Sequence, residues 1–326
     1  MSEVMVSISC ITYNHENYIK DALDSLLMQK TNFKFEILVY DDASTDGTPD
    51  IIREYEKSYP DFIKPVYQPV NQYSRGVKVG KFNNERARGK YIAICEGDDY
   101  WTDPCKLQKQ VDLMEKHPEC TLCVHASYKV CGKDKRIVEK VRPGFGDKFF
   151  TVEEVIESGG GIFATNSILY PGRLVLNRPK FFEIAPVGDF PLLIYLSILG
   201  KVYYIDEFMS AYRVGVDGSW TSRLNCDIEK RVLFVERMGQ MLNEIDEYSN
   251  FKYSRSIERC ILKHQFDLLL AQARYKDVKN DKFAELYKKL DSSIKMKLFL
   301  RYYFPFLYAK IKNIKQTLTL TAKERQ

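Results

Sequence analysis

The sequence predicts an α/β fold: a doubly wound, mostly parallel sheet with helices on both faces, followed by a helical C-terminal extension. Short apolar runs alternate with amphipathic helical stripes through the first half of the chain. Acidic and aromatic residues follow directly after several apolar runs, where an open parallel sheet places its ligand. From about Ser222 onward, every segment has a helical pattern.

The first elements show the alternation clearly. Val4–Thr12 is rich in β-branched residues and forms the first predicted strand. The next helix has an apolar stripe at i, i+3, i+4, i+7 and i+8, made of Ile19, Ala22, Leu23, Leu26 and Leu27. Residues 35–40 are nearly all apolar, as expected for a strand covered on both faces. Thr48 and Pro49 then supply an N-cap and a first-turn proline for another helix.

The same criteria give the later elements. Helices are expected to end near Gly89, to begin after Asp103-Pro104 and to cover 190–199. A flexible break is expected at Gly159-Gly160-Gly161. The remaining predicted strands are 62–68, 91–95, 121–130, 162–170, 201–205 and 209–214.

The net charge of +5 at pH 7 is modest but unevenly distributed. Residues 294–326 carry eight basic residues against one acid, so this segment is +7 and the rest of the chain is −2. A nearly neutral body argues against a nucleic-acid partner, and we expect none. The basic, aromatic end favours contact with an anionic surface such as a membrane.

Neither an export signal nor a membrane-spanning helix is apparent in the sequence. Residues 1–4 lack a basic start, and no window reaches the roughly 20 apolar residues of a transmembrane helix. The eight cysteines are scattered through predicted core elements, which is typical of reduced thiols. We therefore expect a cytoplasmic protein that is peripheral at the inner face of the cell membrane if its basic end binds lipid.

His117, Cys120, Cys123 and His125 are close enough in sequence to suggest zinc. Strand alternation, however, turns Cys123 and His125 to one face and leaves His117 and Cys120 in the preceding turn. The chain has neither a second Cys-x-x-Cys pair nor a glycine-rich knuckle. We therefore predict structural side chains at these positions.

Two acidic turns follow predicted strands. Asp98 and Asp99 come after the fourth strand, and Asp41 and Asp42 after the second. Adjacent carboxylates repel each other, and Mg2+ or Mn2+ prefers such oxygen ligands. The alternative for Asp98 and Asp99 is a solvated turn, and the alternative for Asp41 and Asp42 is a helix-capping loop. A carboxylate at the second strand can accept a base N–H or a ribose hydroxyl. Tyr13, after the first strand, offers a ring for stacking on a base, with core packing as the alternative.

Three motifs, in this order and spacing, resemble those of glycosyltransferase family 2, whose fold is called GT-A. They are Cys10-Ile11-Thr12-Tyr13-Asn14, Asp41-Asp42-Ala43-Ser44-Thr45-Asp46-Gly47-Thr48 and Glu96-Gly97-Asp98-Asp99. The resemblance covers at least the first 130 residues and continues less sharply to about residue 215. It implies inverting transfer of a sugar from a nucleotide diphosphate-sugar, with UDP favoured, to a hydroxyl of a glycan or lipid-linked glycan in cell-surface polysaccharide biosynthesis.

The resemblance also implies roles for individual residues. The donor nucleotide would be contacted by Thr12, Tyr13, Asn14, Asp42 and Asp98. Asp99 would hold a divalent cation, Mn2+ or Mg2+. Residues 1–220 would form the GT-A catalytic domain, with 1–130 binding the nucleotide-sugar and 131–220 the acceptor. Residues 221–326 would form the helical extension with its basic aromatic tail.

Asp189 is predicted to be the catalytic base. An inverting transfer needs a group that takes the acceptor's proton, and Asp189 begins an apolar helix at the position where the resemblance expects the base. Capping of that helix is the alternative, and the two roles are compatible. Gly215 stands where relatives often carry a histidine, so nucleotide binding is predicted more firmly than metal binding. Arg86, Arg88 and Arg213 are candidates for assisting the diphosphate, with structural ion pairs as the alternative.

Two rival functions stay open. A nucleotidyltransferase also uses a doubly wound sheet and paired acids, but residues 11–16 lack its glycine-rich phosphate loop and lysine. A catalytically idle nucleotide-binding or scaffold subunit of an envelope-assembly complex is the second rival, and the intact acids disfavour it.

Residues 298–308 are almost entirely apolar and aromatic and are flanked by lysines. This segment is too short to span a bilayer but suits the headgroup layer, so we expect peripheral membrane contact through 295–315. Docking of the same side chains onto the catalytic domain is the alternative.

Overall fold

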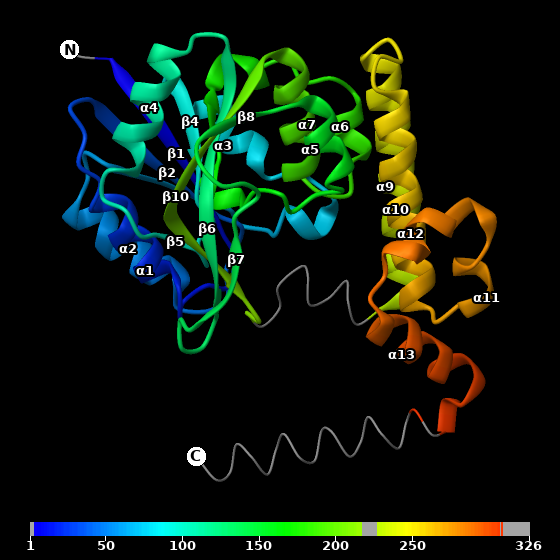
Figure 1. Cartoon of the computed structure of the whole chain (residues 1–326). Coiled ribbons are helices and arrows are strands. Elements are labelled where there is room, and N and C mark those ends of the chain that lie inside the picture. Colours follow the sequence, from blue (N-terminus) through cyan, green and yellow to red (C-terminus); the bar gives the residue numbers. More distant parts are fainter. Residues whose placement is uncertain (1–2, 217–226, 307, 309–326) are drawn as a thin grey trace.

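The computed structural model describes residues 3–216, 227–306 and 308, and ten strands form one sheet at its centre (Figure 1). The sheet order is β3-β2-β1-β4-β9-β6-β10-β5, with β7 paired to β6 and β8 to β10. In chain order the strands are β1 (Val4–Thr12), β2 (Lys34–Asp41), β3 (Ile63–Tyr67), β4 (Tyr91–Ile94), β5 (Tyr100–Trp101), β6 (Cys120–Cys131), β7 (Ile137–Val141), β8 (Lys148–Phe150), β9 (Leu169–Pro171) and β10 (Lys201–Val214).

Helices cover both faces of the sheet, and a helical extension follows. The helices of the sheet domain are α1 (Ile19–Leu27), α2 (Thr48–Ser58), η1 (Tyr73–Arg75), α3 (Gly80–Arg86), α4 (Lys106–Lys116), α5 (Val152–Glu157), η2 (Thr165–Ser167), η3 (Gly172–Val175), α6 (Phe181–Ile184) and α7 (Asp189–Leu199). Those of the extension are α9 (Ile228–Tyr248), α10 (Ser254–Ala271), α11 (Tyr275–Val278), η4 (Asp281–Phe283), α12 (Ala284–Lys289) and α13 (Ser292–Tyr303).

The predicted parallel sheet is confirmed for β1 to β4, which pair in parallel. The other half is mixed, because β9 runs antiparallel to both β4 and β6, whereas β10 runs parallel to β6. β6 therefore points the same way as β1 and β4. The carboxyl ends of all these parallel strands lie at one edge of the sheet.

Three predicted strands differ from those observed. The strand predicted at 162–170 is reduced to the short β9, because the turn η2 precedes it and Ser167 donates a hydrogen bond to the Ala164 carbonyl (2.7 Å). The strands predicted at 201–205 and 209–214 are one continuous strand, β10. Its register shifts between Ile205 and Phe208, so a β-bulge bends it where the sequence suggested a break.

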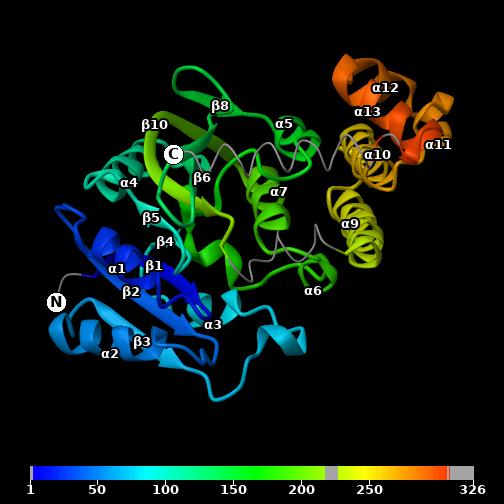
Figure 2. The same ribbon diagram turned by 90° about the horizontal axis from the view of Figure 1, so that it is seen from below.

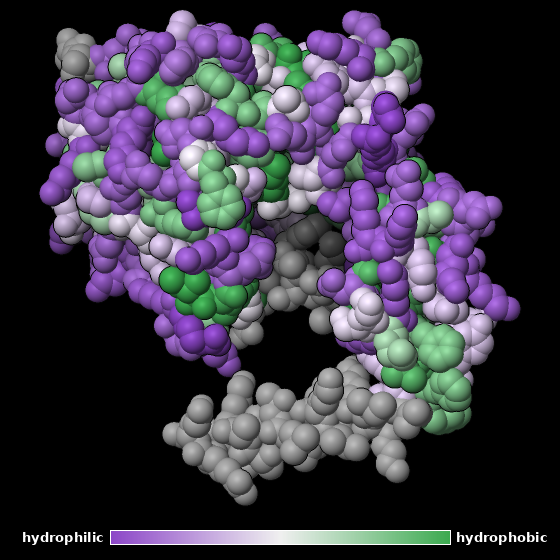
Figure 3. Space-filling model, in the orientation of Figure 1, coloured by the Kyte–Doolittle hydropathy of each residue, from purple (hydrophilic) through white to green (hydrophobic). Residues whose placement is uncertain are grey.

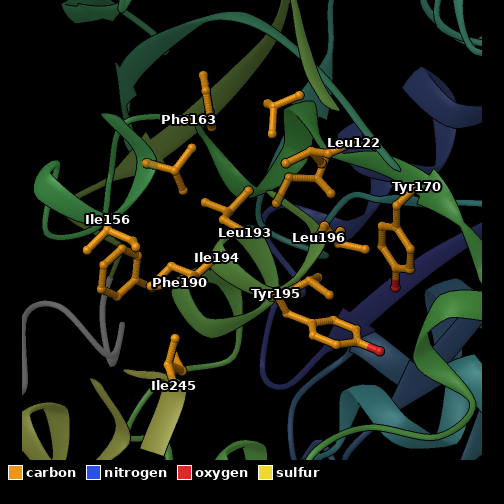
Figure 4. Close-up of a cluster of buried hydrophobic side chains, with 14 of the residues drawn as sticks. Leu122, Ile156, Phe163, Tyr170, Phe190, Leu193, Ile194, Tyr195, Leu196 and Ile245 are labelled. Atoms are coloured by element: carbon orange, nitrogen blue, oxygen red, sulfur yellow. The ribbon is translucent and has the colours of Figure 1, made fainter. Parts of the chain in front are cut away.

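Two hydrophobic clusters pack on opposite faces of the sheet. Residues of β6 alternate between them: Leu122 and Val124 face one cluster and Cys123 faces the other. The Cys123 cluster is covered by α1, α2 and α4. The Leu122 cluster is covered by α5, α6 and α7, and Figure 4 shows the side chains of α7 at its centre. This helix is apolar all round, as expected for a buried one.

The helices of the extension pack in two groups. Met241, Leu242 and Ile245 of α9 are fully buried in the same cluster as α7, so α9 and α10 complete the core of the sheet domain. Beyond them, α11 to α13 form a smaller cluster around Phe266 of α10 and lie outermost (Figure 2). The predicted division at residue 220 falls within 217–226, outside the described residues, and stays a prediction.

The cysteine and histidine cluster near β6 is built into the packing. Cys123 and His125 are fully buried in β6, and the Nδ1 atom of His125 lies 2.8 Å from the Ala126 carbonyl oxygen. His117 stacks on the Tyr203 ring at 5.7 Å. These contacts account for the side chains without zinc.

Candidate active site

The three motif turns meet at the carboxyl edge of the sheet, and backbone hydrogen bonds join them. The Asp42 amide donates to the Thr12 carbonyl (3.0 Å), which ties the turn after β2 to the end of β1. The Gly97 amide donates to the Ile11 carbonyl (2.8 Å), which ties the turn after β4 to the same strand. The central position of β1 between β2 and β4 therefore brings the motifs together.

The turn after β1 contains the buried hydroxyl of Thr12, the exposed ring of Tyr13 and the side-chain amide of Asn14, which bonds the turn after β2. Thr12 is buried, and its Oγ1 has no hydrogen-bond partner among the described residues. Tyr13 is 43% exposed, so its ring is available for stacking. Asn14 adopts a left-handed conformation (φ 54°) and accepts a hydrogen bond from the Thr45 amide (2.8 Å). Donor contacts by these three residues stay predictions.

Gly97 is required by the close packing of this turn. A Cβ added there would lie 2.6 Å from Thr12 Oγ1 and 3.0 Å from His15 Nδ1. Only glycine lets the acidic turn lie this close to β1.

The predicted nucleotide ligand Asp42 is already engaged with the protein. It is buried, and its two carboxylate oxygens accept hydrogen bonds from the amides of Gln72 (2.8 Å) and Tyr73 (2.9 Å). Asp42 therefore holds the loop that begins η1. Each carboxylate oxygen of Asp42 can accept a second hydrogen bond, which a base or ribose could donate. The nucleotide contact of Asp42 stays a prediction.

The acidic turn after β4 presents its carboxylates differently from the expectation. Asp99, the predicted metal ligand, is fully buried and accepts hydrogen bonds from the Arg213 amide (2.8 Å) and from Asn166 Nδ2 (3.0 Å). The Asp98 side chain is 19% exposed, and its Oδ2 lies 3.9 Å from His15 Nε2. The metal-ligand role of Asp99 and the nucleotide contact of Asp98 both stay predictions.

Acidic side chains are crowded in this turn, and the described part of the chain places no unpaired cation beside them. Burial, followed by the charges of Asp98 and Asp189, raises the pKa of Glu96 to about 8. Burial also lowers the pKa of His15, against the opposing effect of Asp98, so His15 adds no positive charge at neutral pH. The Arg213 guanidinium is committed: it binds Asp21 and the Asp98 carbonyl (2.6 Å).

This charge distribution fits a divalent cation bound together with a ligand. Among the described residues, no three His, Cys, Asp or Glu side chains are grouped as a preformed metal cage. Mg2+ in nucleotide sites, however, is held by one or two carboxylates together with the substrate's phosphates. Glu96 and Asp98 offer such carboxylates, and their mutual repulsion would be relieved by the ion.

Asp189 lies beside the acidic turn. It is the first residue of α7, and the residue that caps this helix is Gly188, which has no side chain to do so. Thr165 Oγ1 donates to Asp189 Oδ2 (3.3 Å), and the neighbouring Asn166 binds Asp99. Because the charge of Asp189 also raises the pKa of Glu96, the structure brings Asp189 and the acidic turn together.

The turn η2 is the part of the site that the sequence did not reveal. Thr165 and Asn166 connect Asp189 to Asp99, and Asn166 also bonds the Ala211 carbonyl (3.0 Å) and accepts from Ser210 (2.7 Å). Three polar residues inside an otherwise apolar run were the available signal.

The three candidate arginines are structural, which is the alternative that the sequence left open. Arg86 donates to the carbonyls of Val39 (2.9 Å) and Lys64 (2.8 Å), and Arg88 pairs with Glu36. Arg213 lies between the rings of Tyr18 and Tyr100 and positions the acidic turn.

Comparison with known proteins identifies relatives along most of the chain. The family model described as glycosyl transferase family 2 matches residues 7–168. An uncharacterised protein of Mycobacterium tuberculosis is 35% identical over 226 residues, which are 67% of this chain and 61% of the relative. A putative teichuronic acid biosynthesis glycosyltransferase of Bacillus subtilis is 39% identical over 111 residues, or 34% of this chain and 42% of the relative. The chain thus spans about 61% of the length of the mycobacterial relative.

Solved structures share the fold. Residues 1–349 of TarS from S. aureus, in complex with UDP-GlcNAc, superpose with a TM-score of 0.62 at 17% identity, covering 92% of this chain and 93% of TarS. The mannosyltransferase PcManGT from Pyrobaculum calidifontis, in complex with GDP-Man and Mn2+, gives 0.55 at 16% identity, covering 96% and 87%. These similarities confirm the expected GT-A fold.

Proposed function

Because the chain belongs to glycosyltransferase family 2, we propose that it transfers a sugar from a nucleotide diphosphate-sugar, with inversion, to a hydroxyl of a glycan or lipid-linked glycan. One observation carries the proposal: Glu96, Asp98 and Asp189 converge where the turn after β1 exposes Tyr13. UDP is the favoured nucleotide because the TarS complex holds UDP-GlcNAc. The teichuronic acid relative supports a role in cell-surface polysaccharide biosynthesis.

In this proposal the donor lies across the carboxyl ends of β1 and β4. Tyr13 stacks on the base, and Asp98, assisted by Glu96, is the carboxylate that holds Mn2+ or Mg2+. We assign this role to Asp98 instead of Asp99 because the Asp98 side chain is 19% exposed, whereas Asp99 is fully buried. The ion, when bound, neutralises the charge that develops on the departing diphosphate.

Asp189 supplies the base. The acceptor hydroxyl attacks the anomeric carbon opposite the diphosphate, and its proton passes to the Asp189 carboxylate. Thr165 orients this carboxylate through its hydrogen bond to Oδ2.

Thermal unfolding with nucleotides and Mn2+ tests the donor half of the proposal. We expect UDP with Mn2+ to raise the melting temperature by several degrees, since a ligand at 100 times its Kd stabilises by about 2.7 kcal/mol. EDTA should remove the shift, and ATP serves as the control nucleotide. Proton NMR of slow donor hydrolysis should then show the sugar released first with the anomeric configuration opposite to that of the donor.

Three outcomes would contradict the proposal. A protein that no nucleotide stabilises, with or without Mn2+, lacks the donor site. Formation of a nucleoside triphosphate from UDP-sugar and pyrophosphate would indicate a nucleotidyltransferase, and nucleotide binding without any turnover would indicate a scaffold subunit.

We further propose peripheral membrane contact through the C-terminal end. No helix of the described residues is both long and apolar enough to span a bilayer. Leu298 of α13 is buried against the small cluster around Phe266, so this helix partly docks onto the protein. Phe304 and Phe306 beyond it are exposed, the latter to 91%, and the surface there is apolar (Figure 3). Lys295, Lys297 and Arg301 flank them in sequence; residues 309–315 lie outside the described part of the chain.

Vesicle co-sedimentation tests this contact. We expect binding to phosphatidylglycerol vesicles that weakens with salt, and little binding to phosphatidylcholine, because lysines add electrostatic attraction to aromatic insertion. Phe304→Ser with Phe306→Ser should reduce the bound fraction several-fold. Phe251→Ser is the matched control, because Phe251 is 66% exposed at the α9–α10 turn. Equal binding to both lipids, unaffected by the paired substitution, would contradict the proposal.

A further inference from the structure

A groove of about 420 Å³ lies between the β6–β7 hairpin and the loop that follows α5. Its walls include Lys129, Lys140 and Arg142 from the hairpin side and Ser158, Gly160 and Gly161 from the loop. A second hollow of about 370 Å³ lies at the amino ends of β1 and β4, lined by Met5 and Lys90 among others. That hollow is at the opposite edge of the sheet from the acidic turn, so only the first groove is placed to serve the site.

Chains of contacts through buried side chains join both walls of the groove to the surroundings of Asp189. On the hairpin side, Lys129 shares a face of β6 with Ser127, because side chains two apart on a strand point the same way. Ser127 lies 3.5 Å from Asn166 Oδ1, next to the Thr165 that binds Asp189. On the loop side, a Cβ at Gly160 would lie 3.7 Å from the ring of Phe190, the residue after Asp189.

The loop wall presents backbone instead of side chains. Gly159, Gly160 and Gly161 all have left-handed φ values (73°, 95° and 75°), a conformation that other residues adopt only with strain. A Cβ at Gly161 would meet nothing within 4 Å, so the glycine there is required by the backbone and not by crowding. A sugar ring can therefore approach this wall closely.

The hairpin side of the groove carries an excess of positive charge, although Glu139 also lines it. Lys129 is paired with Glu139 and Lys140 with Tyr128, so the two lysines border the groove from opposite faces of the β6–β7 pair. Lys129 pairs with Glu139 (2.9 Å), and Arg142 pairs with Asp206 (2.6 Å). The Lys140 ammonium pairs with no carboxylate among the described residues and lies 5.5 Å from the centre of the Phe208 ring. An anion bound in the groove could therefore pair with Lys140. It could also pair with Lys129 alongside the exposed Glu139.

An exposed aromatic ring adjoins this wall. Phe145 is 86% exposed, and the Arg142 guanidinium lies 4.5 Å from the centre of its ring. One face of the ring is thus held by the arginine while most of its surface stays open to solvent, as a platform for a sugar ring requires.

We infer that this groove binds an acceptor glycan bearing anionic groups, carboxylate or phosphate. The charges orient it: Asp98 and Asp189 repel an anion from the reacting end, whereas Lys129 and Lys140 attract it into the groove. A neutral hydroxyl of the same glycan then faces Asp189. The inference rests on the proposed function, since it assigns the acceptor class of the same site.

Binding titrations with defined oligosaccharides test it. The protein, saturated with UDP and Mn2+, is titrated in a calorimeter at fixed salt with an oligogalacturonate, a glycerol-phosphate oligomer and a neutral oligogalactoside of equal length. We expect at least one anionic oligomer to bind about tenfold more tightly than the neutral one. A preference between the two anionic oligomers assigns the group as carboxylate or phosphate.

Charge reversal locates the binding. Lys129→Glu with Lys140→Glu should weaken the anionic oligomer about tenfold or more, and the Gln pair should have a smaller effect in the same direction. Lys30→Glu with Lys57→Glu is the matched control, because both lysines are exposed and do not line the groove: Lys30 follows α1 and Lys57 lies in α2. Each variant must retain the UDP and Mn2+ melting shift, which shows that it is folded and that the donor site is intact.

The outcomes separate this inference from the proposed function. If neither anionic oligomer binds better than the neutral one, or if the groove variant binds like the control, the inference is wrong while the donor shift still supports a transferase. Loss of the donor shift in the unmodified protein would overturn the proposed function itself.

Discussion

Asp189→Asn should lower sugar turnover by about 10²- to 10⁴-fold, the usual contribution of a general base, and leave nucleotide binding intact. The amide keeps the size of the side chain and can still accept the Thr165 hydrogen bond, but it cannot take a proton. Turnover is measured as UDP released from a UDP-sugar, and binding as the UDP and Mn2+ melting shift. Because the amide removes one repelling charge beside Glu96, nucleotide affinity should not fall.

Asp50→Asn is the control for this substitution. Asp50 is also an aspartate in the first turn of a helix, α2, and it pairs with Arg53 away from the site. Removing a negative charge from the first turn of a helix lowers folding stability by about 0.3–1 kcal/mol, in α2 as in α7. Asp50→Asn and Asp189→Asn should therefore both melt within a few degrees of the parent protein. An Asp189→Asn protein that turns over at the parental rate would remove Asp189 as the base.

Asp98→Asn and Asp99→Asn should have opposite effects on ligand binding and on stability. Asp98 has one side-chain neighbour at 3.9 Å, so its substitution should leave the melting temperature of the free protein unchanged while removing most of the Mn2+-dependent shift. Asp99 accepts two N–H donors in a buried position, and an amide there must turn its own N–H₂ toward one of them. That mismatch should cost about 1–3 kcal/mol of folding stability.

The pair of variants separates the two candidates for the metal. Melting curves of both proteins, with and without UDP and Mn2+, give the two effects in one experiment. The opposite pattern would favour Asp99 as the metal ligand. In that case the Asp98→Asn protein would keep the full Mn2+-dependent rise in melting temperature, and the Asp99→Asn protein would be stable but would lack this rise.

Local sequence patterns were sufficient to predict the strands and the helix that carry the three motifs. β1, β2 and β4 are apolar runs that end in polar residues, and the apolar stripe of α1 reads at helical spacing, so these elements were predicted close to their observed bounds. Strand order then places their ends together.

The partners of the acids depend on contacts that periodicity does not encode. Asp99 is held by Arg213, which is 114 positions away, and Asp42 by amides about 30 positions away. The turn η2 was missed for a related reason: its polar side chains are explained only by the acids that they bind. The adjacency of Asp98 and Asp99 in sequence likewise did not indicate which of the two is buried.

The shared core of α7 and α9 means that the sheet domain cannot be isolated by trimming the chain at residue 220. Met241, Leu242 and Ile245 would leave, and each fully buried apolar side chain stabilises by about 1.5–3 kcal/mol. The ring of Phe190 would also lose its neighbour His264 on α10. The packing of α9 and α10 thus reaches the first turn of α7, so a displacement of these two helices would be transmitted to Asp189, the proposed base.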